Sequence, residues 1–94
     1  MPWMMNGWRF PAGRVVMTRG AWSELPYEDV MEAFVRHLAG DWGELDEHDR
    51  QQNEHALQHG GRLCSRYVSR QGTAFWIITE WDRSVTTVLL PMEY

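Results

Sequence analysis

Residues 73–80 read Thr-Ala-Phe-Trp-Ile-Ile-Thr-Glu, which is the strongest strand signal in the chain. β-Branched and aromatic side chains fill this stretch, and these residue types are enriched in strands. A turn-like segment stands on each side of it, at residues 70–72 and 81–83. Similar stretches lie beyond both turns, at residues 62–69 and 84–90, and the second is stopped by a proline. The pattern predicts three consecutive antiparallel strands joined by short turns.

The region before these three strands predicts one strand and two helices. Residues 13–18 form a short β-branched run. We expect a first helix with Ser23 as its N-cap, because apolar residues then recur at helical spacing until Gly40. Residues 44–59 predict a second, more polar helix. The predicted fold is a small β-α-α-β-β-β domain of the α+β class, with a mostly antiparallel four-stranded sheet and two helices on one face.

The domain is expected to cover residues 13–94, preceded by an apolar arm over residues 1–12. A length of 94 residues allows one domain with a single modest core. A content of 44% hydrophobic and 23% charged residues argues against disorder throughout. The arm is either a tail folded onto the core or an aromatic docking segment, and it lacks the features of a signal peptide. Because the single Cys64 cannot form an internal disulfide, we expect a reducing, cytoplasmic setting.

The two faces of the sheet follow from the turns, provided that each turn has three residues. Ser69 then lies opposite Thr73, and Glu80 lies opposite Ser84. The face expected under the helices carries no charge and collects Leu63, Ser65, Tyr67, Phe75, Ile77, Thr79, Val85, Thr87 and Leu89. The opposite, outer face collects Arg62, Cys64, Arg66, Trp76, Ile78, Glu80, Thr86 and Val88. Since two helices cover only one face of a small sheet, we expect the arm, a second copy or a partner to cover the outer face.

Charges are divided unevenly along the chain. The 13 acidic residues and 9 basic residues, all of them Arg, give a net charge of −4. Residues 23–59 carry ten of the acidic residues and two Arg, so the remainder of the chain is basic. The balance argues against a protein that wraps DNA. It predicts an acidic helical layer, which is either a solvated surface or a contact for a basic partner through Glu44, Asp46, Glu47 and Glu54.

Candidate catalytic and metal-binding residues are few. His55 and His59 lie one helical turn apart, but no third ligand is evident, so exposed helix histidines are the better interpretation. The sequence places no base near Cys64, and it contains no glycine-rich phosphate loop. Asp49 and Asn53 lie one turn apart beside the apolar stripe of the second helix, and we expect them to bond neighbouring backbone groups. We therefore expect no catalytic residue, no metal and no cofactor.

The turn after the central strand holds a dense group of polar residues. Asp82 and Arg83 could form a recognition site there, although Asp in such a turn usually bonds its own backbone. Arg14 and Arg62 would join them if the first strand lies beside the other three. A small ligand-binding domain or enzyme that uses Arg14, Arg62, Asp82 and Arg83 is therefore an alternative function.

Several motifs of this chain resemble a family of short bacterial proteins. They are Gly13-Arg14-Val15-Val16, Gly40-Asp41-Trp42-Gly43, Gly61-Arg62-Leu63 and, above all, the run from Trp76 to Tyr94 with Asp82-Arg83-Ser84-Val85-Thr86-Thr87 at its centre. The resemblance covers roughly residues 13–94. Members are often encoded on plasmids and integrative elements, and some are labelled plasmid-related proteins. The resemblance implies a mobile-element setting and assigns no activity.

Together these observations predict a non-catalytic protein-binding module. The mobile-element setting suggests an inhibitor of a bacterial defence complex, of the anti-CRISPR or anti-restriction type, that acts by occupying a surface. Besides the acidic layer, the candidate contacts are those of the outer face, namely Arg62, Arg66, Trp76, Ile78 and Val88. A small homodimeric accessory or regulatory protein is an alternative. Nucleic acid is disfavoured as a partner because no recognition-helix pattern is present, and no segment has the length to span a membrane.

Overall fold

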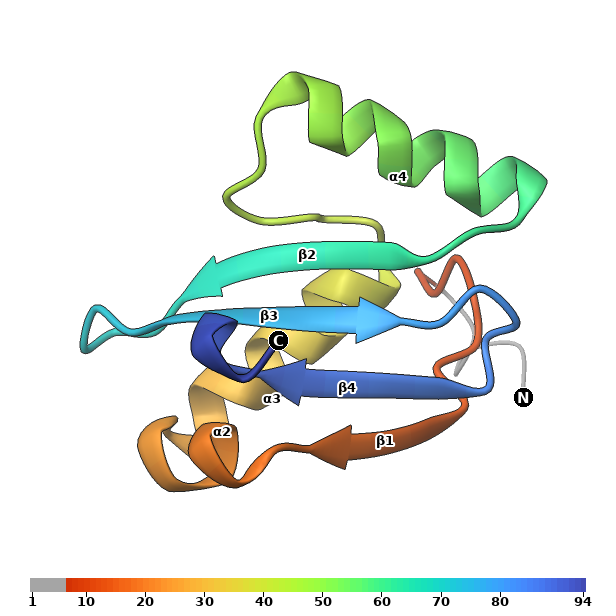
Figure 1. Cartoon of the computed structure of the whole chain (residues 1–94). Coiled ribbons are helices and arrows are strands. Elements are labelled where there is room, and N and C mark those ends of the chain that lie inside the picture. The colour runs from red at the N-terminus through yellow and green to blue at the C-terminus, as the bar shows by residue number, and fades with distance from the viewer. Residues whose placement is uncertain (1–6) are drawn as a thin grey trace.

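The computed structural model describes residues 7–94, which form a four-stranded mixed sheet and three α-helices (Figure 1). In chain order the elements are β1 (Arg14–Met17), α2 (Arg19–Glu24), α3 (Tyr27–Leu38), α4 (Glu47–His59), β2 (Leu63–Val68), β3 (Ala74–Thr79), β4 (Val85–Leu89) and the 3-10 turn η1 (Pro91–Glu93). The strand order is β1-β4-β3-β2, with β1 parallel to β4 and the other two pairs antiparallel. The α+β class and the four predicted strands are confirmed. None of the helices in this range is long and apolar enough to cross a bilayer.

The first predicted helix is in fact two helices, so the N-cap predicted at Ser23 is wrong. α2 begins one turn earlier, where the hydroxyl of Thr18 accepts the N–H of Ala21. Pro26 then supplies the extended residue that precedes α3. A proline is accommodated there because the first turn of a helix needs no N–H at that position. α3 is the amphipathic helix that the apolar spacing predicts, and it buries one side against the sheet.

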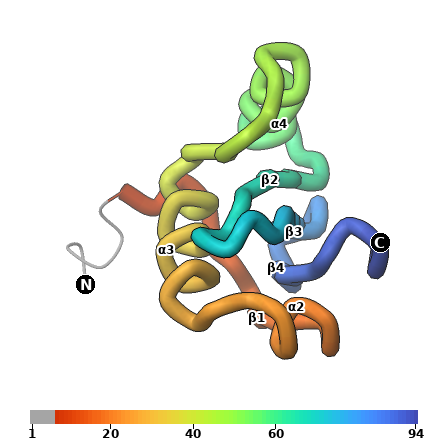
Figure 2. The backbone as a smooth tube through the Cα atoms, turned by 90° about the vertical axis from the view of Figure 1, so that its left-hand side faces the viewer, coloured from red at the N-terminus to blue at the C-terminus, as the bar shows by residue number. Residues whose placement is uncertain are grey.

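α3 covers one face of the sheet, whereas α4 lies along the β2 edge (Figures 1 and 2). The prediction of two helices on one face is therefore wrong for α4. This helix is too polar to cover a sheet face, since its one buried residue is Asn53. The Asn53 side chain bonds both backbone groups of Cys64, at 2.8 and 3.1 Å, and so pairs with a strand rather than with a turn. The N–H of Glu44 also donates to the C=O of Arg66 on β2, so the segment before α4 covers more of the β2 edge.

Two clusters of buried side chains form the core. The larger one lies between α2, α3 and the sheet and contains Ala21, Leu25, Val30, Ala33, Tyr67, Phe75, Ile77, Val88 and Leu90. The smaller one contains Phe10, Leu38, Trp42 and Leu63. Phe10 belongs to the predicted arm over residues 1–12, so this part of the arm packs into the core. The other part of that prediction, at residues 1–6, lies outside the described residues.

The predicted faces are right for β2 and β3 and wrong for β4. Thr79 pairs with Thr86, so the connection from β3 to β4 is one residue longer than a three-residue turn would make it. A shift of one residue moves every side chain of a strand to the other face. Val88, predicted on the outer face, consequently lies under the helices and is 1% exposed. Leu89 takes the outward position instead, opposite Trp76.

The outer face is covered in part by the chain's own C-terminal turn (Figure 2). The Tyr94 ring lies 5.4 Å from the Trp76 ring, and the Tyr94 hydroxyl accepts a hydrogen bond from Arg62 at 2.6 Å. Glu93 fixes this turn, because its carboxylate accepts hydrogen bonds from the Thr18 hydroxyl and from a backbone N–H of α2. The cover expected from the arm, a second copy or a partner thus comes partly from the C-terminus.

Candidate functional site

The carboxylates of the predicted acidic layer differ in what they contact. Those exposed around the start of α4 are Glu44, Asp46 and Glu47. Glu54 instead accepts two hydrogen bonds from the guanidinium of Arg9, both at 2.8 Å, and one from the indole of Trp42 at 2.9 Å. The bond from Arg9 holds the pKa of Glu54 below its ordinary value. Glu54 therefore ties residue 9 of the arm to α4, and its carboxylate is occupied within the chain.

Two groups of side chains of the types that ligate metals lie on α4 or at its N-cap within the described residues, and both are exposed. Asp46, His48 and Asp49 place ligand atoms within 4.8 Å of one another. Asp46 is already the N-cap of α4, where it accepts the N–H of Asp49 at 2.9 Å. The rings of His55 and His59 lie 4.4 Å apart, as their spacing of one helical turn requires. Helix capping and helical spacing explain both groups without a metal.

Four of the five residues predicted as contacts on the outer face do lie on that side, and Val88 does not. Arg66 is exposed and opposite Trp76 on the neighbouring strand. Ile78 is buried, and Tyr94 packs on Trp76. Arg62 is paired with Glu80 as well as with Tyr94. This face consequently offers less apolar surface than its sequence predicts.

Asp82 and Arg83 bond the backbone around the β3–β4 connection. Asp82 accepts the N–H of Ser84 at 3.0 Å, as the turn interpretation expects. The Arg83 guanidinium donates to the C=O groups of Gly61 and Ala56 and so ties the end of α4 to this connection. Arg14 lies on β1, which does pair with β4, but its side chain is exposed. The hydrogen bonds of Arg83 thus hold parts of the backbone together, and they are separate from the contacts that Arg62 makes with Glu80 and Tyr94.

A buried histidine on α3, which no predicted site includes, is the centre of an extended polar network in the core. Nδ1 of His37 lies 2.6 Å from the hydroxyl of Ser65, and Nε2 lies 2.9 Å from the hydroxyl of Thr79. The Thr79 hydroxyl lies 2.7 Å from that of Thr86, which donates to the C=O of Ala12. Every buried side-chain polar atom among residues 7–94 has a hydrogen-bond partner. The network is therefore fully satisfied.

A base beside a hydroxyl is also the arrangement of a nucleophilic active site. Here, however, His37 and Ser65 have no exposed surface. The rings of Phe10 and Trp42 close over the imidazole edge-on, at 5.2 and 5.8 Å. Burial, aided by the charge of Arg83, lowers the pKa of His37 to about 3, so the ring is neutral at pH 7 and a poor proton acceptor. The geometry supports a structural role for this network.

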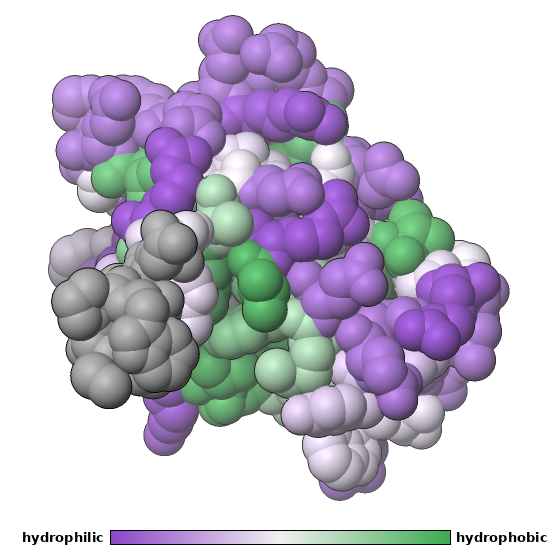
Figure 3. All heavy atoms as spheres, turned by 180° about the vertical axis from the view of Figure 1, so that it is seen from behind, coloured by the Kyte–Doolittle hydropathy of each residue, from purple (hydrophilic) through white to green (hydrophobic). Residues whose placement is uncertain are grey.

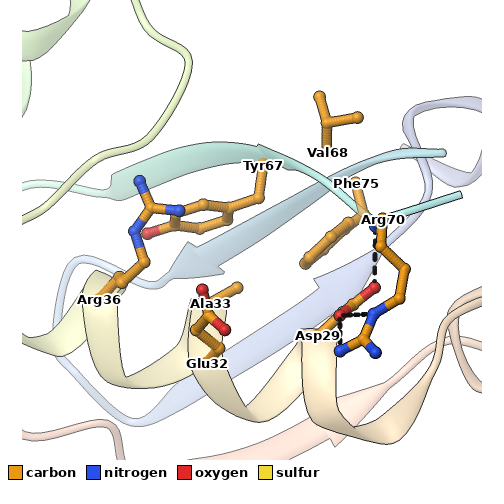
Figure 4. Close-up of a pocket in the computed structure, with 8 residues that line it drawn as sticks. All are labelled: Asp29, Glu32, Ala33, Arg36, Tyr67, Val68, Arg70 and Phe75. Atoms are coloured by element: carbon orange, nitrogen blue, oxygen red, sulfur yellow. Dashed lines mark hydrogen bonds and ion pairs between the residues drawn. The ribbon is translucent and has the colours of Figure 1, made fainter. Parts of the chain in front are cut away.

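A polar hollow of about 240 Å³ lies between α3 and the end of β2 (Figure 4). In it, Asp29 accepts hydrogen bonds from the backbone N–H and the guanidinium of Arg70. The guanidinium of Arg36 lies 5.0 Å from the centre of the Tyr67 ring and is also paired with Asp41. Small-molecule pockets usually measure about 300–1,000 Å³ and hold convergent free polar groups. The hollow is smaller, and most of its charged groups neutralise one another.

An apolar groove opens beside β1, on the side of the sheet that carries α3. We call it the β1 groove, a hollow of about 280 Å³ lined by Val15, Met17, Trp22, Tyr27, Val30, Met31, Phe34 and Val88. Figure 3 views this side and shows apolar side chains gathered there among polar ones. Trp22 and Tyr27 are 75% and 70% exposed. No lining residue is charged, so the groove is suited to apolar contacts.

The β1 groove arises because β1 extends the sheet beyond the part that α3 packs against. Val15 pairs with Thr86, and Met17 pairs with Val88, so Val15 and Met17 share the core-facing side of the sheet. Val15 is nevertheless 48% exposed. A core-facing strand position that stays open to solvent is a surface that another chain can cover.

No family model, no curated protein and no solved structure matches this chain. The geometry of residues 7–94 therefore selects the candidate site. Polar groups with reactive geometry are buried, and most charged groups of the polar hollow are paired. The β1 groove, in contrast, combines apolar lining with open access.

Proposed function

We propose that this protein is a non-catalytic protein-binding module whose binding surface is the β1 groove. The observation that carries the proposal is the exposure of Trp22 and Tyr27 beside the half-open Val15. Clustered apolar side chains rimmed by polar ones are typical of protein-interaction sites. Trp and Tyr are also the residue types that contribute most to binding energy at such sites. The acidic layer and the outer face remain alternative surfaces.

A catalytic function has less support. His37 is sealed in the core, and Arg62 and Arg83 are held by separate contacts within the chain. Binding by surface contact needs neither a nucleophile nor a cofactor. A protein-binding module is thus the function that the accessible chemistry supports best.

The experiment compares two tryptophans that are matched in exposure. Trp22 lies in the β1 groove, and Trp81, which is 70% exposed, lies in the β3–β4 connection. Proteins captured by the tagged wild-type chain should be retained by Trp81→Ala. Trp22→Ala should weaken their binding by about 30-fold, as loss of a hot-spot Trp does. Equal capture by both variants would contradict the assignment of the groove.

The resemblance to plasmid and integrative-element proteins supports a more specific form of the proposal. In this form the module acts in the bacterial cytoplasm and inhibits a CRISPR or restriction complex by occupying one of its surfaces. The test is the transformation efficiency of a targeted plasmid in cells that carry such a system. The wild type and Trp81→Ala should restore transformation, whereas Trp22→Ala should not. If the wild-type chain restores transformation against neither class of system, this specific form is wrong.

A further inference from the structure

The outer edge of β1 presents backbone groups that no residue between 7 and 94 bonds. β1 pairs with β4 through the N–H groups of Arg14 and Thr18, which donate to Ser84 and Val88. Backbone groups alternate in direction along a strand. The N–H and C=O groups of Val15 and Met17 therefore point away from the sheet, along the mouth of the β1 groove.

At the opposite edge of the sheet, formed by β2, part of the edge is covered by other segments of the chain. On β2, Asn53 bonds both outward backbone groups of Cys64, and the segment around Gly43 bonds those of Arg66. Proteins usually protect an edge with such cover, with proline or with an inward-pointing charge. The stretch Arg14–Met17 has no proline, and its groove-facing residues are uncharged. Within the described residues, the fold covers the β2 edge at Cys64 and Arg66 and leaves the β1 edge available for pairing.

We propose that the partner of the β1 groove is a second copy of this chain, whose β1 pairs antiparallel with this β1 and continues the sheet across a twofold axis. The inference rests on the proposed function and names the partner of the same groove. A twofold contact uses the same surface of both copies. The strand that adds itself must therefore be complementary to itself, and the sequence of β1 meets this condition.

The pairing centred on Val16 satisfies every outward backbone group of the strand. Val15 then lies opposite Met17 of the second copy, and the two exchange backbone hydrogen bonds on both sides of the axis. The uncharged pair faces the groove, where each copy also contributes Trp22. Arg14 lies opposite Thr18 of the second copy, so no Arg opposes another Arg. The groove can accept a strand whose facing side chains are apolar and uncharged, and Val15 and Met17 give β1 such a side.

The first test is the mass of the full chain in solution, measured by sedimentation equilibrium over a range of concentrations. The wild type should approach twice its 11.1 kDa. Val15→Lys should raise the dissociation constant of the dimer by at least about tenfold, because a lysine on an open edge prevents pairing. Val68→Lys is the matched control, since Val68 is 46% exposed and lies on β2, at the opposite edge of the sheet. It should leave the dimer unchanged.

A second test reports the register directly. At the centre of the pairing, Val16 faces Val16 of the second copy at a Cα separation of about 4.5 Å, within the range that a disulfide bridges. Val16→Cys in a Cys64→Ser background should form a disulfide-linked dimer on mild oxidation. Val68→Cys in the same background should remain monomeric under denaturing conditions. A dimer that forms without the Val16→Cys cross-link and resists Val15→Lys would overturn the β1 pairing.

The two proposals fail in different ways. If the wild type is monomeric at all concentrations, the second copy is not the partner. Loss of capture of another protein by Trp22→Ala would then still support the β1 groove as a binding surface. If capture is also unaffected, both the partner and the groove are wrong.

Discussion

The carboxamide of Asn53 takes the place of a neighbouring strand beside Cys64, accepting its N–H at 3.1 Å and donating to its C=O at 2.8 Å. A side-chain amide has the same donor and acceptor as a peptide group, so it can satisfy both. This contact explains why a helix with few apolar residues is held against the sheet. It also closes the β2 edge to a further strand.

Replacing Asn53 with Ala should destabilise the fold, because two backbone groups of a half-buried residue lose their partners. We expect the free energy of unfolding to fall by about 2–3 kcal/mol, measured by urea denaturation. Gln52→Ala is the control, since Gln52 is exposed and adjacent on the same helix. Similar values for the two variants would show that the amide does not hold the edge.

The register of β4 can be tested with two valines of the same strand. Val88 is buried under the helices, whereas Val85 is only half-buried. Val88→Ala should lower the free energy of unfolding by about 2–3 kcal/mol, and Val85→Ala by less than about 1 kcal/mol. A larger loss at Val85 than at Val88 would instead match the three-residue turn that the sequence predicted.

Much of the sheet could be predicted because its strands are rich in β-branched and aromatic residues and are separated by turn residues. The register of β4 could not be predicted, because it depends on the number of residues in the β3–β4 connection. Arg83 adopts a φ of 60°, a region in which residues other than Gly are uncommon. Its guanidinium bonds the C=O groups of Gly61 and Ala56, which supports this conformation. Such a tertiary contact has no local sequence signal.

The β1 groove could not be predicted from local sequence patterns, whereas the burial of His37 could. His37 follows Val30 at one helical repeat of seven residues, and this spacing places it on the buried side of α3. The β1 groove has no such signal. It exists because β1 lies at the end of the strand order, where Trp22 and Tyr27 flank it. Surfaces of this kind depend on the arrangement of elements distant in the sequence.

Two substitutions of Arg83 separate its side-chain contacts from its backbone conformation. Arg83→Ala loses the bonds to Gly61 and Ala56 and keeps a side chain that disfavours positive φ. Arg83→Gly loses the same bonds but adopts positive φ freely. We expect Arg83→Ala to be less stable than wild type by about 2–3 kcal/mol and Arg83→Gly to recover about 1 kcal/mol of that loss. Thermal unfolding measures both, and equal stability of all three proteins would remove any role for the guanidinium.

The buried His37 should make the fold less stable in mild acid. Its pKa is about 3 in the folded protein and 6.5 in an unfolded chain. Between these values the unfolded chain binds a proton that the folded protein excludes, so the free energy of unfolding falls as the pH drops below 6.5. One proton corresponds to about 1.4 kcal/mol per pH unit, hence about 2 kcal/mol between pH 7 and pH 5.

Urea denaturation of the wild type and of His37→Gln across this pH range isolates the effect. Gln is neutral and polar, so the variant should be less stable at pH 7 but should show a flatter dependence on pH. The exposed His48, His55 and His59 are present in both proteins and cancel in the comparison. The carboxylates of Glu54 and Asp29 have lowered pKa values, so their contribution is lost only in stronger acid. Parallel pH profiles would mean that His37 is protonated as readily in the folded protein as in the unfolded one.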